Sequence, residues 1–202
     1  MIFPAHYFVI YLVADHAFVN NHTLDRQPFK KFLGHLLWSF LVVLAFTFDT
    51  LLKTTDRAVI FLSFAGLHLL MDWIRWRFHR NKIVELANLV IVFIYTLLFS
   101  SFLKRSYVSP EFSTYLLGML IVTVGVTYLT RELTEPDRKD TVGISERLAI
   151  YIFAMAGRFE WVIISIIAGL VYRLIFEKRR DITWWLSPLV GALLSFLLFW
   201  LV

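Results

Sequence analysis

Seven ionisable side chains lie within, or at the ends of, long apolar runs of this sequence. They are Asp15, His16, His35, His68, Asp72, Glu85 and Glu146. A charged side chain in the hydrocarbon layer of a membrane costs about 3 kcal/mol even on insertion scales. Such residues therefore usually face the interior of a helix bundle and often serve a function. Carboxylates and imidazoles together can bind a cation, hold a metal ion, exchange protons or fasten helices to one another.

His68 and Asp72 form a pair with a helical spacing. They are four residues apart, so they share one face of a helix. Such a pair can supply two metal ligands, or a histidine whose tautomer is fixed by a carboxylate. Glu85 and Asn88 also share a face, three residues apart. The candidate binding residues are Asp15, His16, His35, His68, Asp72, Glu85 and Asn88, and a divalent metal ion, if one is bound, is expected on His35, His68 and Asp72.

Structural roles stay open beside these functional ones. The His68–Asp72 pair can serve helix packing alone, and Asp15 and His16 can face water at the level of the lipid headgroups. His35 can make an interhelical hydrogen bond, which contributes about 0.6 kcal/mol on average in membranes.

Glu146 needs a cationic partner if it lies inside a membrane bundle. The neighbouring sequence offers Arg147, Arg158 and Arg173. We expect Glu146, Arg147 and Arg173 to form a structural charge cluster, because an ion buried without a partner is strongly destabilising.

The composition predicts an all-α, polytopic transmembrane helix bundle that positions these residues. Hydrophobic residues make up 59% of the 202 residues, and aromatic residues make up 17%. A membrane-spanning helix needs about 20 apolar residues. Eight segments are expected, at about 3–19, 32–52, 58–74, 83–103, 112–130, 143–156, 160–176 and 184–202. The sixth and seventh are short enough to form a tight hairpin instead of two full spans.

The loop charges predict the orientation of these segments. Thirteen Lys and Arg residues follow the first, third, fifth and seventh segments, and five lie in the other loops. The positive-inside rule places the richer loops in the cytoplasm, where they can contact anionic lipid headgroups, and both termini outside. The richer set includes Arg75, Arg77, Arg80 and Lys82, counted as the loop after the third segment. The polar residues then lie near the cytoplasmic ends of their segments.

Domain organisation and several function classes follow from the same composition. We expect one integrated membrane domain with an N-terminal half, 1–103, that carries the His/Asp cluster and a C-terminal half, 112–202. The net charge of +5 is explained by topology, so no nucleic-acid partner is expected. The chain has no Cys, so thiolate chemistry is excluded. No nucleotide-binding, zinc-protease or serine-hydrolase motif is present.

Short motifs in both halves carry a family resemblance. The front half has Ala14-Asp15, then Leu33-Gly34-His35-Leu36, then His68-Leu69-Leu70-Met71-Asp72, then Glu85; the back half has Gly143–Ile150 and Leu189–Ser195. In this order the chain resembles the uncharacterised bacterial inner-membrane family called domain of unknown function 3307. The resemblance implies a multi-pass protein of the bacterial inner membrane, and it implies no particular activity.

The chain departs from that family pattern at three potential ligands. Tyr11 stands where family members commonly have a His four residues before the first Asp, and Ser39 stands where a second His often follows the first. Glu85-Leu86 with Asn88 replaces an Asp-Gln pair with a nearby His. These departures weaken the case for a His-rich metal site.

Three functions remain after these exclusions. We favour solute or ion binding or transport at the polar site. The alternatives are a non-catalytic membrane partner or assembly subunit, acting with another copy or another membrane protein, and a metal-dependent membrane hydrolase. In the hydrolase, Asp15, His35, His68 and Asp72 would hold a metal whose bound water is the nucleophile.

Overall fold

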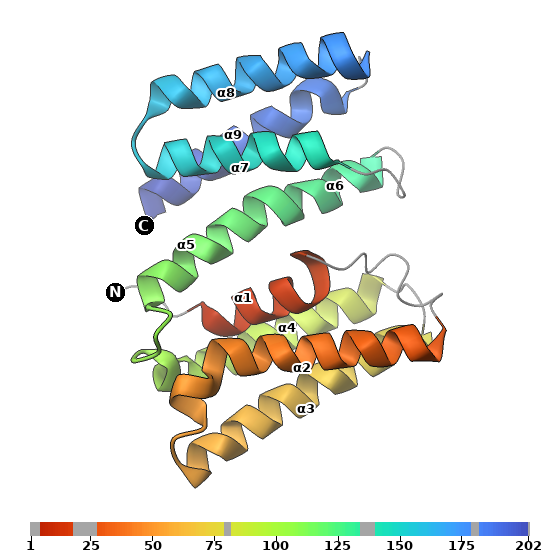
Figure 1. Ribbon diagram of the computed structural model, residues 1–202, viewed down its shortest axis with the longest axis vertical. Helices are drawn as coiled ribbons and strands as arrows, with labels where there is room; N and C mark the ends of the chain where they lie inside the picture. The colour runs from red at the N-terminus through yellow and green to blue at the C-terminus, as the bar shows by residue number, and fades with distance from the viewer. Residues whose placement is uncertain (1–4, 18–27, 79–81, 134–139, 179–181, 202) are drawn as a thin grey trace. The chain divides into compact units, whose positions relative to one another are not determined.

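The structure, a computed structural model, is built of helices (Figure 1). It describes residues 5–17, 28–78, 82–133, 140–178 and 182–201, and no strand occurs among them. The α-helices are α1 His6–Leu12, α2 Phe29–Leu51, α3 Thr55–Phe78, α4 Lys82–Phe99, α5 Pro110–Leu120, α6 Val126–Leu133, α7 Thr141–Met155, α8 Phe159–Tyr172 and α9 Thr183–Leu201. The all-helical prediction is confirmed.

In the described residues, six stretches of helix are long and apolar enough to cross a membrane. They are Phe29–Leu51, Thr55–Phe78, Ile83–Leu103, Pro110–Thr130, Phe159–Glu177 and Trp184–Leu201. The chain is therefore an integral, multi-pass membrane protein. The first and sixth expected segments are helical but short: α1 has 7 residues and α7 has 15. Eight spans and outside termini remain predictions.

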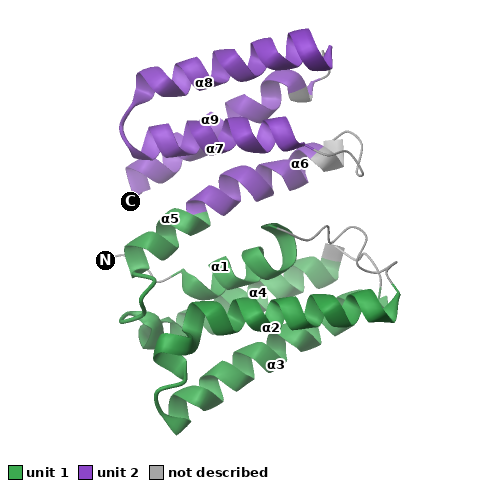
Figure 2. Cartoon of the chain, viewed as in Figure 1, with its two compact units in different colours: residues 1–117 green, residues 118–202 purple. Residues whose placement is uncertain are grey.

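The chain forms two compact units, Met1–Leu117 and Gly118–Val202 (Figure 2). In the first unit, α1 is the central element. Five of its seven residues are buried, namely His6, Tyr7, Val9, Ile10 and Tyr11. A helix that is apolar on nearly every side belongs inside a bundle, and α1 accordingly packs against α2 and α4.

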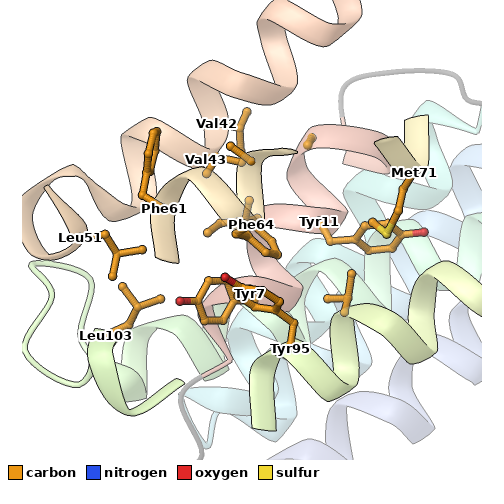
Figure 3. Close-up of a cluster of buried hydrophobic side chains, with 14 residues drawn as sticks. Tyr7, Tyr11, Val42, Val43, Leu51, Phe61, Phe64, Met71, Tyr95 and Leu103 are labelled. Atoms are coloured by element: carbon orange, nitrogen blue, oxygen red, sulfur yellow. The ribbon is translucent and has the colours of Figure 1, made fainter. Parts of the chain in front are cut away.

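Aromatic and aliphatic side chains fill the core around α1 (Figure 3). The ring centroid of Tyr7 lies 4.7 Å from that of Phe64 and 5.0 Å from that of Tyr95. Rings at these separations attract one another beyond the effect of area burial, so α1 is held firmly against α3 and α4.

Turns of π-helix interrupt the α-helices beside the buried charges. In the described residues they are η1 Val13–Ala17, η4 Ile121–Gly125 and η5 Arg173–Glu177. Asp15 lies in η1, Arg173 begins η5, and carbonyl groups of η4 accept hydrogen bonds from Arg147. A π turn adds one residue to a helical turn and frequently marks a functional site. Each of these π turns therefore contains or contacts a buried charged side chain.

In the second unit, α7 packs against both α8 and α9. Glycines allow this close approach where α7 carries charged side chains. A Cβ atom added to Gly169 of α8 would overlap the Glu146 carboxylate, and one added to Gly191 of α9 would lie 2.8 Å from Cγ of Arg147. The side chains of Glu146 and Arg147 thus fill the space that larger residues at positions 169 and 191 would need.

Gly169→Ala should lower the free energy of unfolding by about 1–3 kcal/mol, because the new methyl group displaces the buried Glu146 side chain. Gly66→Ala is the matched control, since Gly66 lies on an exposed face of α3 with no heavy atom within 4 Å of an added Cβ. Thermal melting of both variants in detergent measures the difference. Equal melting temperatures would contradict this packing.

Candidate functional site

Four polar residues of the first unit converge from three elements. Asp15 comes from η1, His35 from α2, and His68 and Asp72 from α3, and they are 0%, 6%, 1% and 0% exposed. The buried face of α3 explains why His68 and Asp72 point toward the other two residues. Its members are Phe61, Phe64, Ala65, His68, Met71, Asp72 and Arg75, at the three- and four-residue spacing of one helix face. The sequence therefore places His68 and Asp72 on the face that packs inward.

Each imidazole lies beside both carboxylates. Nε2 of His35 is 3.7 Å from Oδ1 of Asp15 and 3.2 Å from Oδ2 of Asp72. Nε2 of His68 is 3.2 Å from Oδ1 of Asp15 and 3.8 Å from Oδ2 of Asp72. Asp15, His35 and Asp72 each offer one potential metal-binding atom within 4.8 Å of the other two.

These separations place each imidazole at ion-pairing distance from both carboxylates. Nε2 of His35, Nε2 of His68 and Oδ1 of Asp15 are buried and have no hydrogen-bond partner among the described residues. Oδ2 of Asp72 accepts a hydrogen bond from Ser39 Oγ at 3.1 Å. Buried polar atoms are nearly always satisfied, so these three atoms are available to a further partner.

Arg75 binds the two aspartates through the carboxylate oxygens that do not contact the histidines. Its Nη1 donates to Oδ2 of Asp15 at 2.9 Å and to Oδ1 of Asp72 at 3.1 Å. Its Nε lies 2.9 Å from Oε1 of Glu85, and its Nη2 donates to the Tyr11 hydroxyl at 3.2 Å. One guanidinium thus orients three carboxylates. We call Asp15, His35, His68, Asp72, Arg75 and Glu85 the N-terminal polar cluster.

The prediction that Arg75 lies in a loop was wrong. The residue was counted in the loop after the third segment, but α3 continues to Phe78, so Arg75 and Arg77 both lie in the helix. Lys82 begins α4, and Arg80 lies outside the described residues. Arg75 is 3% exposed, whereas Arg77 is exposed. The three-residue spacing from Asp72 was the available signal that Arg75 faces the cluster.

Two further contacts come from Tyr11 and Ser39. Tyr11 accepts a hydrogen bond from Arg75, and Ser39 donates one to Asp72. Each is four residues from a predicted site residue, Asp15 or His35, so helical spacing could have identified both.

The remaining predicted site residues lie at the edge of the cluster or beside it. The Glu85 side chain is 25% exposed, so the cluster reaches the surface of the unit there. His16 is partly buried, with Nε2 3.5 Å from the Tyr11 hydroxyl. Asn88 is 3% exposed, and its Nδ2 has no hydrogen-bond partner among the described residues.

The second unit holds a separate charge cluster. Glu146 pairs with Arg173, which was one of its three expected partners, and Arg147 pairs with Asp140 at 2.9 Å. Arg147 also donates to the carbonyl oxygens of Val122 and Thr123. Two carboxylates therefore face two guanidinium groups. This arrangement supplies its own charge compensation and joins α7 to its neighbours.

Comparisons of the chain with family models, curated proteins and solved structures give no match. The resemblance to domain of unknown function 3307 therefore stays a prediction. The geometry of the two clusters is what bears on function.

Replacing Arg75 by Gln should lower the free energy of unfolding by about 3–5 kcal/mol, because it leaves buried carboxylates without their guanidinium. Arg77→Gln is the matched control and should change stability little. Chemical or thermal unfolding in the same detergent measures both. Similar losses in the two variants would show that Arg75 does not hold the cluster together.

Proposed function

We propose that this membrane protein binds a cation at the N-terminal polar cluster. The observation that carries the proposal is the charge of the cluster. In the part of the chain that the structure describes, Asp15, Asp72 and Glu85 are paired with a single permanent cation, Arg75. With neutral imidazoles, two negative charges remain, and the two aspartates are fully buried.

An excess of negative charge is energetically costly inside an apolar bundle. A buried ion that loses its partner destabilises a protein by about 3–5 kcal/mol. A cation bound between the aspartates and histidines would remove this cost and give the unpaired atoms a partner. The cluster therefore has a physical reason to bind positive charge.

Protonation of both histidines would also restore neutrality, and a rise in melting temperature that depends on the added cation separates the two cases. A protonated imidazole stabilises a carboxylate by aiming an N–H group at one of its oxygens. Nε2 of each histidine lies 3.2 Å from a carboxylate oxygen, which is close enough for such a bond.

Transport of the cation is the second candidate. The exposed edge at Glu85 favours it, because Glu85 contacts Arg75 and Arg75 contacts both aspartates. A cation arriving at Glu85 would thus meet a continuous series of polar groups. Cation binding is the function that the geometry supports best. A partner subunit, a second copy of the chain and a bacterial inner-membrane location remain predictions from sequence.

A cation screen tests this proposal. Protein washed with a chelator and placed in lipid nanodiscs should melt at a higher temperature with one of Na⁺, K⁺, Mg²⁺, Ca²⁺, Mn²⁺ or Zn²⁺ at constant ionic strength. A ligand at 100 times its dissociation constant stabilises the folded state by about 2.7 kcal/mol.

Asp72→Asn should abolish this shift, because it removes charge from the cluster. Asp49→Asn should retain it, since Asp49 binds Ser106 Oγ at 3.0 Å and the Tyr107 amide at 2.8 Å, away from the cluster. The proposal fails if no cation raises the melting temperature, or if both variants respond alike.

A further inference from the structure

We infer that the bound cation is a divalent first-row metal ion, from Mn²⁺ to Zn²⁺, and that Asp15, His35 and Asp72 bind it directly. His68 lies outside this set of ligands and orients Asp15. The inference rests on the proposed cation binding, and it adds the class of the ion and a distinction between the two histidines.

Three side chains from three elements bring their donor atoms close together. One oxygen of Asp15, one ring nitrogen of His35 and one oxygen of Asp72 all lie within 4.8 Å of one another. Nε2 of His35 is 3.7 Å from Oδ1 of Asp15 and 3.2 Å from Oδ2 of Asp72. Two atoms that bind the same ion at about 2.0–2.2 Å lie at most about 4.4 Å apart, so both of these separations fit one ion.

The surrounding contacts leave these donor atoms accessible to an ion. Arg75 binds Oδ2 of Asp15 and Oδ1 of Asp72, so the other oxygen of each carboxylate is turned toward His35. Oδ1 of Asp15 and Nε2 of His35 are buried and have no hydrogen-bond partner among the described residues. Ser39 donates to Oδ2 of Asp72. Outer contacts such as those of Arg75 and Ser39 orient the ligands of a metal site and contribute to its affinity.

Charge and donor type together select the class of the ion. With neutral imidazoles, the three carboxylates around Arg75 leave two negative charges, which one divalent ion balances. Calcium and magnesium are bound by oxygen ligands, whereas imidazole nitrogen suits zinc, iron, copper and nickel, and carboxylate oxygen suits manganese as well. A site with two carboxylates and one imidazole therefore favours a divalent first-row metal over Mg²⁺, Ca²⁺ and monovalent ions.

His68 differs from His35 in its place relative to the donor atoms. Among the described residues, the group of mutually close donors consists of Asp15, His35 and Asp72 alone. Nε2 of His68 is instead 3.2 Å from Oδ1 of Asp15, where an N–H group would fix the orientation of that carboxylate. Loss of such an outer partner typically weakens metal binding by about 10–100-fold. His68 is therefore a positioning residue.

Equilibrium dialysis of chelator-washed protein in lipid nanodiscs tests the class of the ion. We expect one Co²⁺ per chain, which Zn²⁺ displaces and which Mg²⁺ or Ca²⁺ does not displace even at a hundredfold excess, about the excess that separates weak from strong donors at such a site. Displacement of Co²⁺ by equal concentrations of Mg²⁺ or Ca²⁺ would overturn the assignment.

Matched glutamine variants test the distinction between the histidines. His35→Gln should weaken Co²⁺ binding by more than about 100-fold, and His68→Gln by about 10–100-fold at most. His6→Gln is the control and should bind Co²⁺ as the wild type does, because buried His6 contacts the Val108 carbonyl at 2.6 Å, outside the cluster. Equal losses in the His35 and His68 variants would overturn the distinction.

Pulsed electron paramagnetic resonance of Cu²⁺ bound to the unmodified protein gives a reading that needs no variant to fold. The remote nitrogen of a coordinated imidazole modulates the electron spin echo, and we expect modulation from a single imidazole. The same signal should persist in His68→Gln, which a ligand role for His68 would not allow. Modulation from two imidazoles, or from none, would overturn the proposed ligands.

The outcomes separate this inference from the proposed function. Binding of Na⁺, Mg²⁺ or Ca²⁺ that depends on Asp72 but not on His35 would overturn the assignment of the ion and leave cation binding standing. Failure of every cation, Co²⁺ and Zn²⁺ included, would overturn both.

Discussion

The balance of charge inside an apolar bundle is the constraint on which this structure depends. The two units meet it differently. In the second unit, two carboxylates face two guanidinium groups, with Glu146 on Arg173 and Asp140 on Arg147. In the first, three carboxylates share Arg75. The described residues thus show a complete ionic network and an incomplete one, and in these ranges only the incomplete one has histidine nitrogens beside its carboxylate oxygens.

The helices of the first unit are arranged around that incomplete network. The short helix α1 lies among longer ones because nearly all of it is apolar and aromatic, and the π turn after it places Asp15 fully inside. The inward stripe of α3 begins with Phe61 and Phe64 and ends with His68, Asp72 and Arg75. One helix therefore contributes side chains to both the aromatic core and the ionic site. Packing energy in its first half holds the polar second half in place.

Much of this arrangement could be predicted from the sequence. Hydrophobic runs located six long helices, and helical spacing put His68 and Asp72 on one face. Their meeting with Asp15 and His35 could not be derived, because it depends on tertiary packing and on a π turn that has no sequence signature. Arg75 was misassigned because an arginine at the end of an apolar run usually marks a loop. Its role depends on the carboxylates around it, which only the fold brings together.

Diffraction from crystals grown in lipid with the cation that raises the melting temperature tests the central claim most directly. We expect density for one cation beside Asp15, His35 and Asp72, with Arg75 bound to Oδ2 of Asp15 and Oδ1 of Asp72 and no comparable density at Asp49. Density for water alone at that point, with direct N–H···O bonds from both histidines to the aspartates, would show that protons and not a bound cation neutralise the site.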